Sequence, residues 1–577
     1  MILQALCDYY ERKPDLPRLG FETKAIPFVI EINAAGQLVQ IEDTRTLEGK
    51  KKIARNFVVP QGLKKSSGVA ANLLWGNAEY VLGISNEGDP KKVKERHTAF
   101  HAKLDTVAAQ TDAGLVAVRA FFRKPDSARL EACPSWQEIL NTKPDMTFRL
   151  QGDLELICQR PAIRAGLGNA GAKEITCLVS GEPDEVSDAN GKPDGLHWSI
   201  PGVWGAQSSG ANIVSFNKDA FNSFGKVKGA NATVGKHVAF AYTTALKYLL
   251  GKESTQRIQV GDTSTVFWSE VHTEFEDSFA DFLNEPPKDD PARRTRAIEA
   301  LIKAPQTGAL SDDRGSTRFY VLGLAPNAAR ISIRFWQVGT VAEMSAQIRQ
   351  YFEDTKIVHA NYDKPYLSLF RLLVSTASLG KSENIPPNLA GEFMRAILTG
   401  QPYPQTLLQA AVRRIRAEQS KKDERTGKPV QNVSYPRAAL IKAYINRSAK
   451  KEELKVSLDE SNTNHAYRLG RLFAALERVQ ERANPNINTT IRERFYGAAS
   501  GTPVTVFPTL LKLKNHHIAK LIKGEAVNQE KLIGAILDGV NEFPAQLNLQ
   551  DQGRFAIGYY HQRQAFFPNT NSPTKGA

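Results

Sequence analysis

Two patterns of hydrophobic and polar residues divide the chain, and they change near residue 340. Before that point, short segments alternate apolar and polar positions, which is typical of strands with one buried face. The clearest segment, PFVIEINAAGQLVQIED at residues 27–43, alternates on both sides of the turn-forming AAG and predicts a hairpin. Residues 319–336, FYVLGLAPNAARISIRFW, predict a second pair of strands joined through a Pro-Asn turn.

Three further segments are rich in the β-branched and aromatic residues that strands favour. We predict strands at 115–123 (LVAVRAFFR), 147–158 (TFRLQGDLELIC) and 174–181 (EITCLVSG). Helices are predicted in two other places. The chain starts with a short amphipathic helix that has to end at Pro14, and a proline-rich charged loop leads into a second helix after Pro291.

From about residue 340 onward, apolar residues recur every three to four positions, as they do along one face of an α-helix. TLLQAAVRRIRAEQ and AYRLGRLFAALERVQERA are examples, and the charged run at 421–436 is expected to be a solvated loop. Successive αα-hairpins of this kind form bundles. The pattern therefore predicts an α+β protein, in which a β-rich, multi-part N-terminal region at 1–340 is followed by an all-α helical-bundle C-terminal region.

The composition narrows the class of partner. The chain has 577 residues, enough for several domains, and it carries a net charge of +14 with a pI of about 9.4. A basic folded protein of this kind most often binds a polyanion, either nucleic acid or an anionic membrane surface. No apolar run approaches the ~18 residues of a membrane span. No long basic amphipathic helix with an aromatic face is found either, so nucleic acid is favoured.

The motifs that could indicate a catalytic or metal site give only weak evidence for one. GLGNAG at 166–171 matches G-x-G-x-x-G, but a strand-like segment follows where a dinucleotide fold needs a helix. The acids at 188–195 lack the glutamate that completes a calcium loop, and the adjacent His516 and His517 point about 100° apart on a helix. The four cysteines form no CxxC pair, and no secretory signal begins the chain, so reduced thiols in a cytoplasmic protein are expected. We expect no enzyme activity and no cofactor.

Nucleic-acid binding requires cations for phosphates, flat side chains for bases, and small residues that let the backbone come close. The first stretch with this mixture lies at residues 48–83, and its candidate residues are Lys50, Lys51, Lys52, Lys64, Lys65, Ser66, Ser67, Asn72 and Trp75. Two lysines followed by small hydroxyl residues suit a loop that grips phosphate, and an Asn side chain can pair with adenine. The alternative is a charged surface loop that leads into an amphipathic helix.

The second stretch, WGAQSSGANIVSFNKDAFNSFGKVKGANATVGK at residues 204–236, mixes small, polar and aromatic residues. Its candidate residues are Ser208, Ser209, Asn212, Asn217, Lys226, Lys228 and Asn231. The glycines and serines would permit close approach of the backbone to nucleic acid, while the aromatic residues anchor the loop or stack on bases. The alternative is that the Ser and Asn side chains cap turns and the Phe residues are core, which we expect for Phe221 and Phe224.

The third stretch belongs to the helical half. Residues 413–455 contain 13 Lys or Arg against 5 Asp or Glu, which suggests a groove for a phosphate backbone. The alternative is a set of solvated helix faces, which are commonly charged. The candidate residues here, together with two arginines of the second predicted strand pair, are Arg330, Arg334, Arg413, Arg414, Arg468, Arg471, Arg492 and Arg494.

Several long segments resemble a known family. These are LQALCDYYER, SSGVAANLLWGNAEYVLG, VSFNKDAFNSFGKVKGANATVG with AFAYTTALKYLL, LGLAPNAARISIRFW, AYRLGRLFAALERVQ and NTTIRERFYGAASGTPVTVFPTLLKLKNHH. Together, and in this order, they resemble the large subunit of the type I-C CRISPR effector complex (Cascade). The resemblance covers nearly the whole chain.

The resemblance implies a non-catalytic subunit at the end of the complex that holds the 5′ handle of the CRISPR RNA. Such a subunit recognises the protospacer-adjacent motif (PAM) on double-stranded DNA, helps to open the duplex and stabilises the R-loop, while RNA–DNA pairing reads the sequence. Its implied partners are CRISPR RNA, target DNA with its displaced strand, the backbone and RNA-processing subunits, and a nuclease-helicase recruited in trans. The alternatives are a nucleic-acid-cleaving enzyme of the same defence system and a scaffold without DNA readout.

The resemblance also divides the helical half. A basic helical region at 341–455 would precede a C-terminal bundle at 456–577 that resembles the small subunit, which the same gene yields by internal translation initiation. This bundle would begin near Val456, whereas the last methionine of the chain is Met394. The internal start would therefore use a codon other than AUG.

Overall fold

The structure, a computed structural model, describes residues 1–49, 51–62, 69–124, 126–165, 175–184, 197–216, 218–286, 288–307, 315–386, 388–485 and 487–567. The side chains of residues 48, 51, 228 and 304–307 are outside this description. The chain forms two compact units. The larger unit comprises Met1–Tyr9, Ser199–Ser215 and Leu246–Ala577, and the smaller unit comprises Tyr10–Trp198 and Phe216–Ala245. The chain passes from one unit to the other at four points: within helices α1 (Ile2–Arg12) and α8 (Lys236–Leu249), between residues 198 and 199, and between residues 215 and 216.

The smaller unit contains a four-stranded sheet with the order β3-β2-β8-β7. Its strands are β2 (Phe28–Ile32), β3 (Leu38–Asp43), β7 (Trp75–Asn77) and β8 (Asp145–Leu150). The predicted hairpin at 27–43 is confirmed as β2 and β3, which pair antiparallel, while β2 and β8 run parallel. The hairpin turn requires a glycine, because Gly36 has a φ of +78° and an added Cβ would lie 2.5 Å from the backbone nitrogen of Phe121.

Smaller elements complete this unit. Three two-stranded ribbons are β1 (Phe21–Ala25) with β6 (Asn56–Pro60), β4 (Thr46–Glu48) with β5 (Lys51–Ile53), and β9 (Ile175–Thr176) with β10 (Pro183–Asp184). The helices are α2 (Ala78–Val81), α3 (Pro90–Asp105), α4 (Ala113–Arg123), α5 (Ser127–Glu131), α6 (Trp136–Thr142) and α7 (Pro161–Ala165). Strand β8 therefore covers only the first part of the predicted strand at 147–158, and β9 covers two residues of the predicted strand at 174–181.

The strand predicted at 115–123 is wrong, because these residues form helix α4. Asp112 caps this helix, since its Oδ1 accepts hydrogen bonds from the backbone nitrogens of Gly114 and Leu115. Leu115, Val118 and Phe121 are buried at a spacing of three residues, which places them on one helical face against the sheet. Tertiary packing and the cap outweigh the strand preference of these β-branched and aromatic residues.

The larger unit contains an antiparallel sheet with the order β11-β12-β13-β14. Its strands are β11 (Arg257–Val260), β12 (Thr263–Ser269), β13 (Arg318–Asn327) and β14 (Arg330–Thr340), so the second predicted strand pair is confirmed. The predicted Pro-Asn turn is wrong, because Pro326 and Asn327 pair with β14 and the turn consists of Ala328 and Ala329. The register shifts at Gly323, where an added Cβ would lie 2.3 Å from the ring of Phe335. On one side of the sheet Trp268, Tyr320 and Trp336 stack, and the indole Nε1 of Trp268 donates a hydrogen bond to the Ala5 carbonyl in α1.

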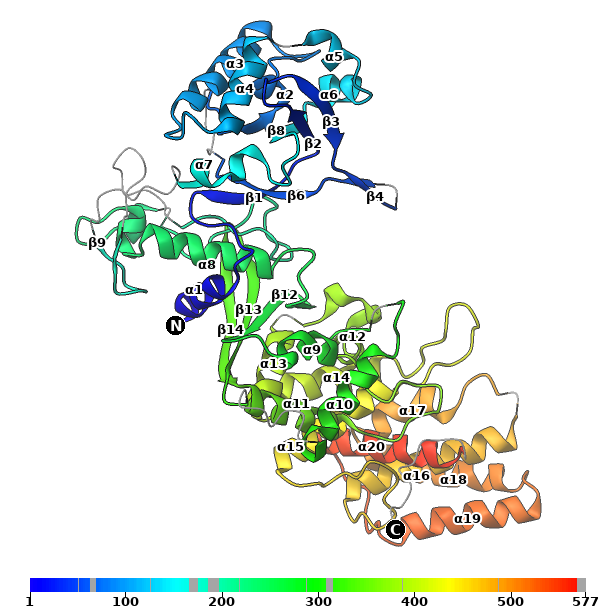
Figure 1. Ribbon diagram of the computed structural model, residues 1–577. Coiled ribbons are helices and arrows are strands. Elements are labelled where there is room, and N and C mark those ends of the chain that lie inside the picture. The colour runs from blue at the N-terminus through cyan, green and yellow to red at the C-terminus, as the bar shows by residue number, and fades with distance from the viewer. Residues whose placement is uncertain are drawn as a thin grey trace. The chain divides into compact units, whose positions relative to one another are not determined.

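Helices make up the rest of the larger unit (Figure 1). They are α9 (Glu274–Leu283), α10 (Arg293–Thr307), α11 (Val341–Thr355), α12 (Leu369–Val374), α13 (Leu389–Thr399), α14 (Gln405–Ala417), α15 (Tyr435–Ala449), α16 (His465–Ala483), α17 (Ile491–Ala499), α18 (Phe507–Ile518), α19 (Lys523–Leu537) and α20 (Leu549–Ala565). Helix α11 begins where the sequence pattern changes, with a capping box between Thr340 and Glu343. Helix α20 packs against α14, α15 and α16, and one hydrophobic core runs from Ile258 to Tyr560.

The α+β prediction is confirmed, since small sheets occupy the part of the chain before residue 340 and helices occupy the part after it. The part before residue 340 also contains helices α2 to α9, of which the sequence pattern predicted none. The two helices that it did predict there are α1 and α10. The division of the helical half into a basic region at 341–455 and a C-terminal bundle at 456–577 stays a prediction. None of the helices in the described ranges has the length and apolar character that a bilayer span requires.

Candidate nucleic-acid interface

The first basic stretch lies only partly within the described residues. Lys50 and the loop that was predicted to grip phosphate are outside them, namely Lys64, Lys65, Ser66 and Ser67. Lys51 and Lys52 lie on β5, and the exposed Lys52 places its Nζ 4.0 Å from Oε2 of Glu138. Next to the two-stranded ribbon of β4 and β5, Arg45 forms ion pairs with both Asp43 and Glu138. Hydrogen bonds from Arg45 lower the pKa of both carboxyl groups, so the ribbon is anchored by a charged cluster.

Trp75 and Asn72 are less accessible than the sequence suggested. Trp75 is 4% exposed, and its indole Nε1 donates a hydrogen bond of 2.7 Å to the Pro60 carbonyl. Its ring is therefore a core contact of the smaller unit and cannot stack on a base in this conformation. Asn72 is half-buried, immediately before the buried Leu73 and Leu74. The following segment enters β7 and the short buried helix α2, which is not the amphipathic helix of the alternative interpretation.

In the larger unit, the structure brings together candidates that are far apart in the sequence. Ser208 and Ser209 lie exposed in a turn, and Asn212 forms an isolated bridge with Arg330 at the start of β14. The carbonyl of Asn212 accepts a hydrogen bond of 2.9 Å from the backbone nitrogen of Ile331. The turn is therefore held beside the β13–β14 hairpin. Arg334, further along β14, pairs with Asp262 at 3.0 Å.

In the smaller unit, the second stretch forms a tight turn at residues 223–226. Asn231 holds it, because its Oδ1 accepts from the Ser223 nitrogen at 3.1 Å and its Nδ2 donates to the Lys226 carbonyl at 3.0 Å. Phe224, at the turn, has a φ of +52° and is 99% exposed, so the prediction that it is a core residue is wrong. Phe221 is 37% exposed and is not core either. Lys226 is exposed, Asn217 lies outside the described residues, and Lys228 is described by its backbone alone.

In the helical half, the predicted arginines divide into exposed and buried groups. Arg413 on α14 and Arg494 on α17 are exposed. Arg414 donates to Ser378 Oγ at 2.9 Å, and Arg468 donates to the Asn462 carbonyl at 2.9 Å. Arg471 and Arg492 are 4% and 2% exposed, so their assignment to an open groove for phosphates is wrong. Arg471 instead binds Gln562 and the carbonyl of Glu460 within the bundle.

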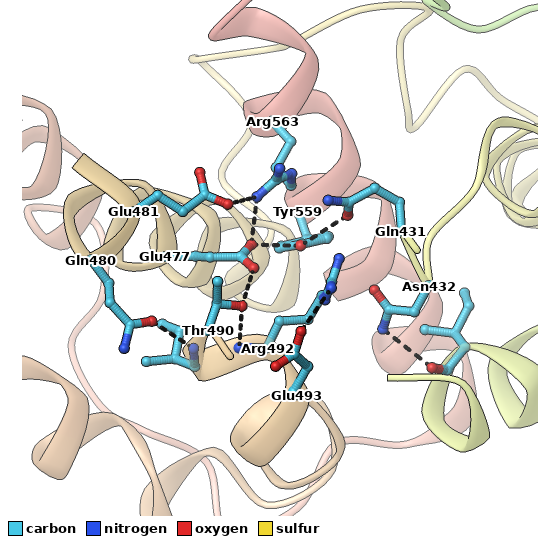
Figure 2. Close-up of polar contacts among 12 residues, drawn as sticks. Gln431, Asn432, Glu477, Gln480, Glu481, Thr490, Arg492, Glu493, Tyr559 and Arg563 are labelled. Carbon is cyan, nitrogen blue, oxygen red and sulfur yellow. Dashed lines mark hydrogen bonds and ion pairs between the residues drawn. The ribbon is translucent and has the colours of Figure 1, made fainter. Parts of the chain in front are cut away.

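Arg492 belongs to a buried polar network around Glu477, which is 1% exposed on α16 (Figure 2). The carboxylate of Glu477 accepts hydrogen bonds from Thr490 Oγ1 at 2.7 Å, Tyr559 OH at 2.6 Å and Arg563 Nη1 at 2.7 Å. Burial by itself raises the pKa of Glu477, but the nearby arginines and the two hydroxyl groups outweigh burial and lower it. The network therefore contains an ionised carboxylate in the core of the bundle.

A cavity of about 690 Å³ borders this network. Among the described residues its lining includes four cations, Lys428, Arg478, Arg482 and Arg492, and three carboxylates, Glu477, Glu481 and Glu525. All three carboxylates already bind arginines. Lys428 has no ion pair within the described ranges, and Nε of Arg492 has no hydrogen-bond partner there. The described lining of this cavity therefore carries one more cationic side chain than carboxylates.

Sequence reasoning missed one feature in each unit, an exposed ring in the smaller unit and a buried carboxylate in the larger unit. The exposed Phe224 follows Ser223 and precedes a glycine, and such a turn could have indicated that its ring faces solvent. Glu477 stands among apolar residues in FAALERV, where an acid on the apolar face of a helix signals a buried ion pair. The G-x-G-x-x-G segment at 166–171 and the acidic segment at 188–195 lie outside the described residues.

Comparison with models of protein families shows the family of this chain. The family model for Cas_Csd1, described as a CRISPR-associated protein, matches residues 6–567. Because this match spans nearly the whole chain, the protein belongs to the Cas_Csd1 family of CRISPR-associated proteins. The resemblance noted from the sequence motifs is therefore confirmed at the level of the family. No curated protein matches the chain.

Proposed function

We propose that the chain is the non-catalytic large subunit of a type I-C CRISPR RNA-guided surveillance complex. In this role it binds the 5′ handle of the CRISPR RNA, recognises the PAM on double-stranded DNA, and helps to open the duplex and stabilise the R-loop. The observation that supports the proposal best, beside the family match, is the stretch at 204–236. Its part in the larger unit has exposed hydroxyl groups at Ser208 and Ser209, and its part in the smaller unit has an exposed cation at Lys226 and a fully exposed ring at Phe224.

Phosphate contacts are tested in the assembled complex with the double variant Lys64→Ala/Lys65→Ala. We expect weaker binding to duplex DNA that carries the PAM, and a decrease of about 1 in the log–log salt slope for each lost phosphate contact. The matched control is Lys91→Ala/Lys92→Ala, which removes the same charge from exposed positions of α3. Equal affinity and slope in wild type and the Lys64/Lys65 variant would exclude this loop from the interface.

Base readout is tested separately with Asn72→Ala. A side chain that reads a base edge changes preference between motifs more than total affinity. We therefore expect the variant complex to accept a broader set of flanking sequences when it is challenged with a library of randomised motifs. An unchanged preference would remove Asn72 from the residues that read the motif.

The same preparations test the two competing functions. If the purified chain cleaves DNA or RNA in a metal-dependent way, and a single carboxylate substitution abolishes this cleavage, the chain is an enzyme. If the complex assembles normally and binds DNA unchanged after the basic clusters are neutralised, the chain is a scaffold without DNA readout. The proposal instead expects cleavage only when a separate nuclease-helicase is added to the complex, and co-purification with CRISPR RNA, the backbone and RNA-processing subunits and a small subunit from the same gene.

A further inference from the structure

His97 and His101 form a pair on helix α3 that the proposed function does not use. They are separated by one helical turn, and their Nε2 atoms lie 3.0 Å apart. Both side chains are half-buried, and the two rings stand nearly perpendicular, with an interplanar angle of 87°. The pair is part of the smaller unit.

The surroundings hold both imidazole rings in place. The Nδ1 of His97 lies 2.9 Å from the Tyr80 carbonyl, so it is the nitrogen that carries the hydrogen. The Nε2 of His97 therefore presents a lone pair toward His101. The ring of Phe122 packs edge-on against both imidazoles, with centroid distances of 5.6 Å and 4.3 Å. Gly83 leaves room for His97, because an added Cβ would lie 2.9 Å from its ring.

The separation of the two Nε2 atoms matches a shared metal ion. With metal–nitrogen bonds of about 2.0–2.1 Å, two imidazoles are about 2.9 Å apart in a square-planar cis arrangement and about 3.3 Å apart in a tetrahedral one. The observed 3.0 Å lies between these values. A hydrogen bond from a histidine to a backbone carbonyl, as between His97 and Tyr80, is the usual second contact of a metal-binding imidazole.

We propose that His97 and His101 form a binding site for a borderline transition metal ion, of the class of Cu²⁺, Ni²⁺ or Zn²⁺. Within the described ranges no group of three His, Cys, Asp or Glu side chains could hold a metal, so the chain supplies two ligands and the other positions are open to water or a partner's side chain. A cavity of about 390 Å³ borders His101 and provides space for them. Binding requires His101 to move its hydrogen from Nε2 to Nδ1, and no net proton is released.

The test uses the purified, untagged full-length chain without nucleic acid, stripped of metal by a chelator and titrated with Cu²⁺, Ni²⁺ and Zn²⁺. We expect one equivalent to bind, and bound Cu²⁺ to show nitrogen hyperfine structure in its electron paramagnetic resonance spectrum. His97→Gln and His101→Gln should each weaken binding by about tenfold or more, and the double variant should abolish it. The matched control His516→Gln/His517→Gln removes two adjacent histidines of α18 and should bind like the wild type.

Circular dichroism of the metal-free variants shows whether they are folded. Should a Gln variant unfold, Asp105→His provides a second test, because it adds a third imidazole one turn further along α3 and should tighten binding at least tenfold. The proposal is overturned if the wild type binds none of the three ions at micromolar concentration, or if the folded double variant binds them equally well. The two histidines would then form only a hydrogen-bonded pair packed on Phe122.

Discussion

Gly470 on α16 and Gly558 on α20 each lie against the backbone of the other helix. A Cβ added at Gly470 would lie 2.0 Å from the Phe555 carbonyl oxygen, and a Cβ added at Gly558 would lie 2.0 Å from the Tyr467 carbonyl oxygen. No real Cβ tolerates such a distance from backbone, so the contact between α16 and α20 exists only because both positions are glycine. This crossing sets the position of Glu477 on α16 relative to Arg563 on α20.

The first prediction concerns this crossing. Gly470→Ala should lower the free energy of unfolding by about 1–3 kcal/mol or more, because the helices have to move apart. Urea denaturation followed by circular dichroism measures the effect. The control is Gly534→Ala on α19, where an added Cβ meets nothing within 4 Å, and this variant should gain about 0.5–1 kcal/mol from better helix propensity. Equal stability of the two variants would contradict the close contact.

The second prediction concerns the buried carboxylate. Glu477→Gln should destabilise the protein by about 1.5–3 kcal/mol, because Arg563 keeps only its pair with Glu481 and the hydroxyl groups of Thr490 and Tyr559 lose an ionised acceptor. Glu530→Gln is the matched control, since Glu530 forms an exposed pair with Lys514 and its loss should cost less than about 1 kcal/mol. Thermal and urea unfolding of the two variants would separate them, and similar losses in both would argue against the buried network.

The third prediction is a pH dependence. The pKa of Glu477 is lower in the folded protein than its ordinary value of 4.5, so its ionised form is favoured by folding. This contribution is fully present above the unfolded pKa and is lost as the pH falls through the folded pKa. The free energy of unfolding should therefore decrease below about pH 5 in the wild type, and more gently in Glu477→Gln. Parallel pH profiles for the two proteins would assign the acid sensitivity to other carboxyl groups.

The fourth prediction rests on the proposed function and concerns Phe224. Because its ring is 99% exposed, Phe224→Ala should change the free energy of unfolding by less than about 0.5 kcal/mol. If the ring stacks on a base, the assembled complex should lose about 1–3 kcal/mol of binding free energy for its target DNA. Tyr362→Ala, which removes another ring that is 90% exposed, is the control. Unchanged DNA affinity in the Phe224 variant would leave this ring without a role in binding.

The fifth prediction separates exposed from buried arginines. Arg494→Ala should reduce the salt slope of DNA binding by about 1 without loss of stability, provided that it contacts a phosphate. Arg471→Ala should leave the slope unchanged and destabilise the bundle, since its guanidinium bonds to Gln562 and Glu460 inside it. Filter binding at several salt concentrations together with thermal unfolding distinguishes the two effects. A reduced slope in a folded Arg471 variant would place this residue at the interface after all.

Local sequence patterns determined the elements that depend on near neighbours. The hairpins at 27–43 and 319–336, the helix before Pro14 and the start of the helical half near 340 are confirmed, because alternation, turn residues and caps act over a few positions. The family was also readable from the sequence, since its long motifs are contiguous. Helix α4 was mistaken for a strand because its β-branched and aromatic residues favour strands, and only packing against the sheet decided otherwise.

Tertiary structure alone decided which polar residues are accessible. Arg471, Arg492 and Arg494 have the same chemistry and stand close together in the sequence, but the first two enter the core of the bundle and the third faces solvent. Trp75 is buried and Phe224 is exposed, the opposite of what their neighbours suggested. Burial depends on contacts between segments far apart in the chain, and no local pattern of hydrophobic and polar residues contains that information.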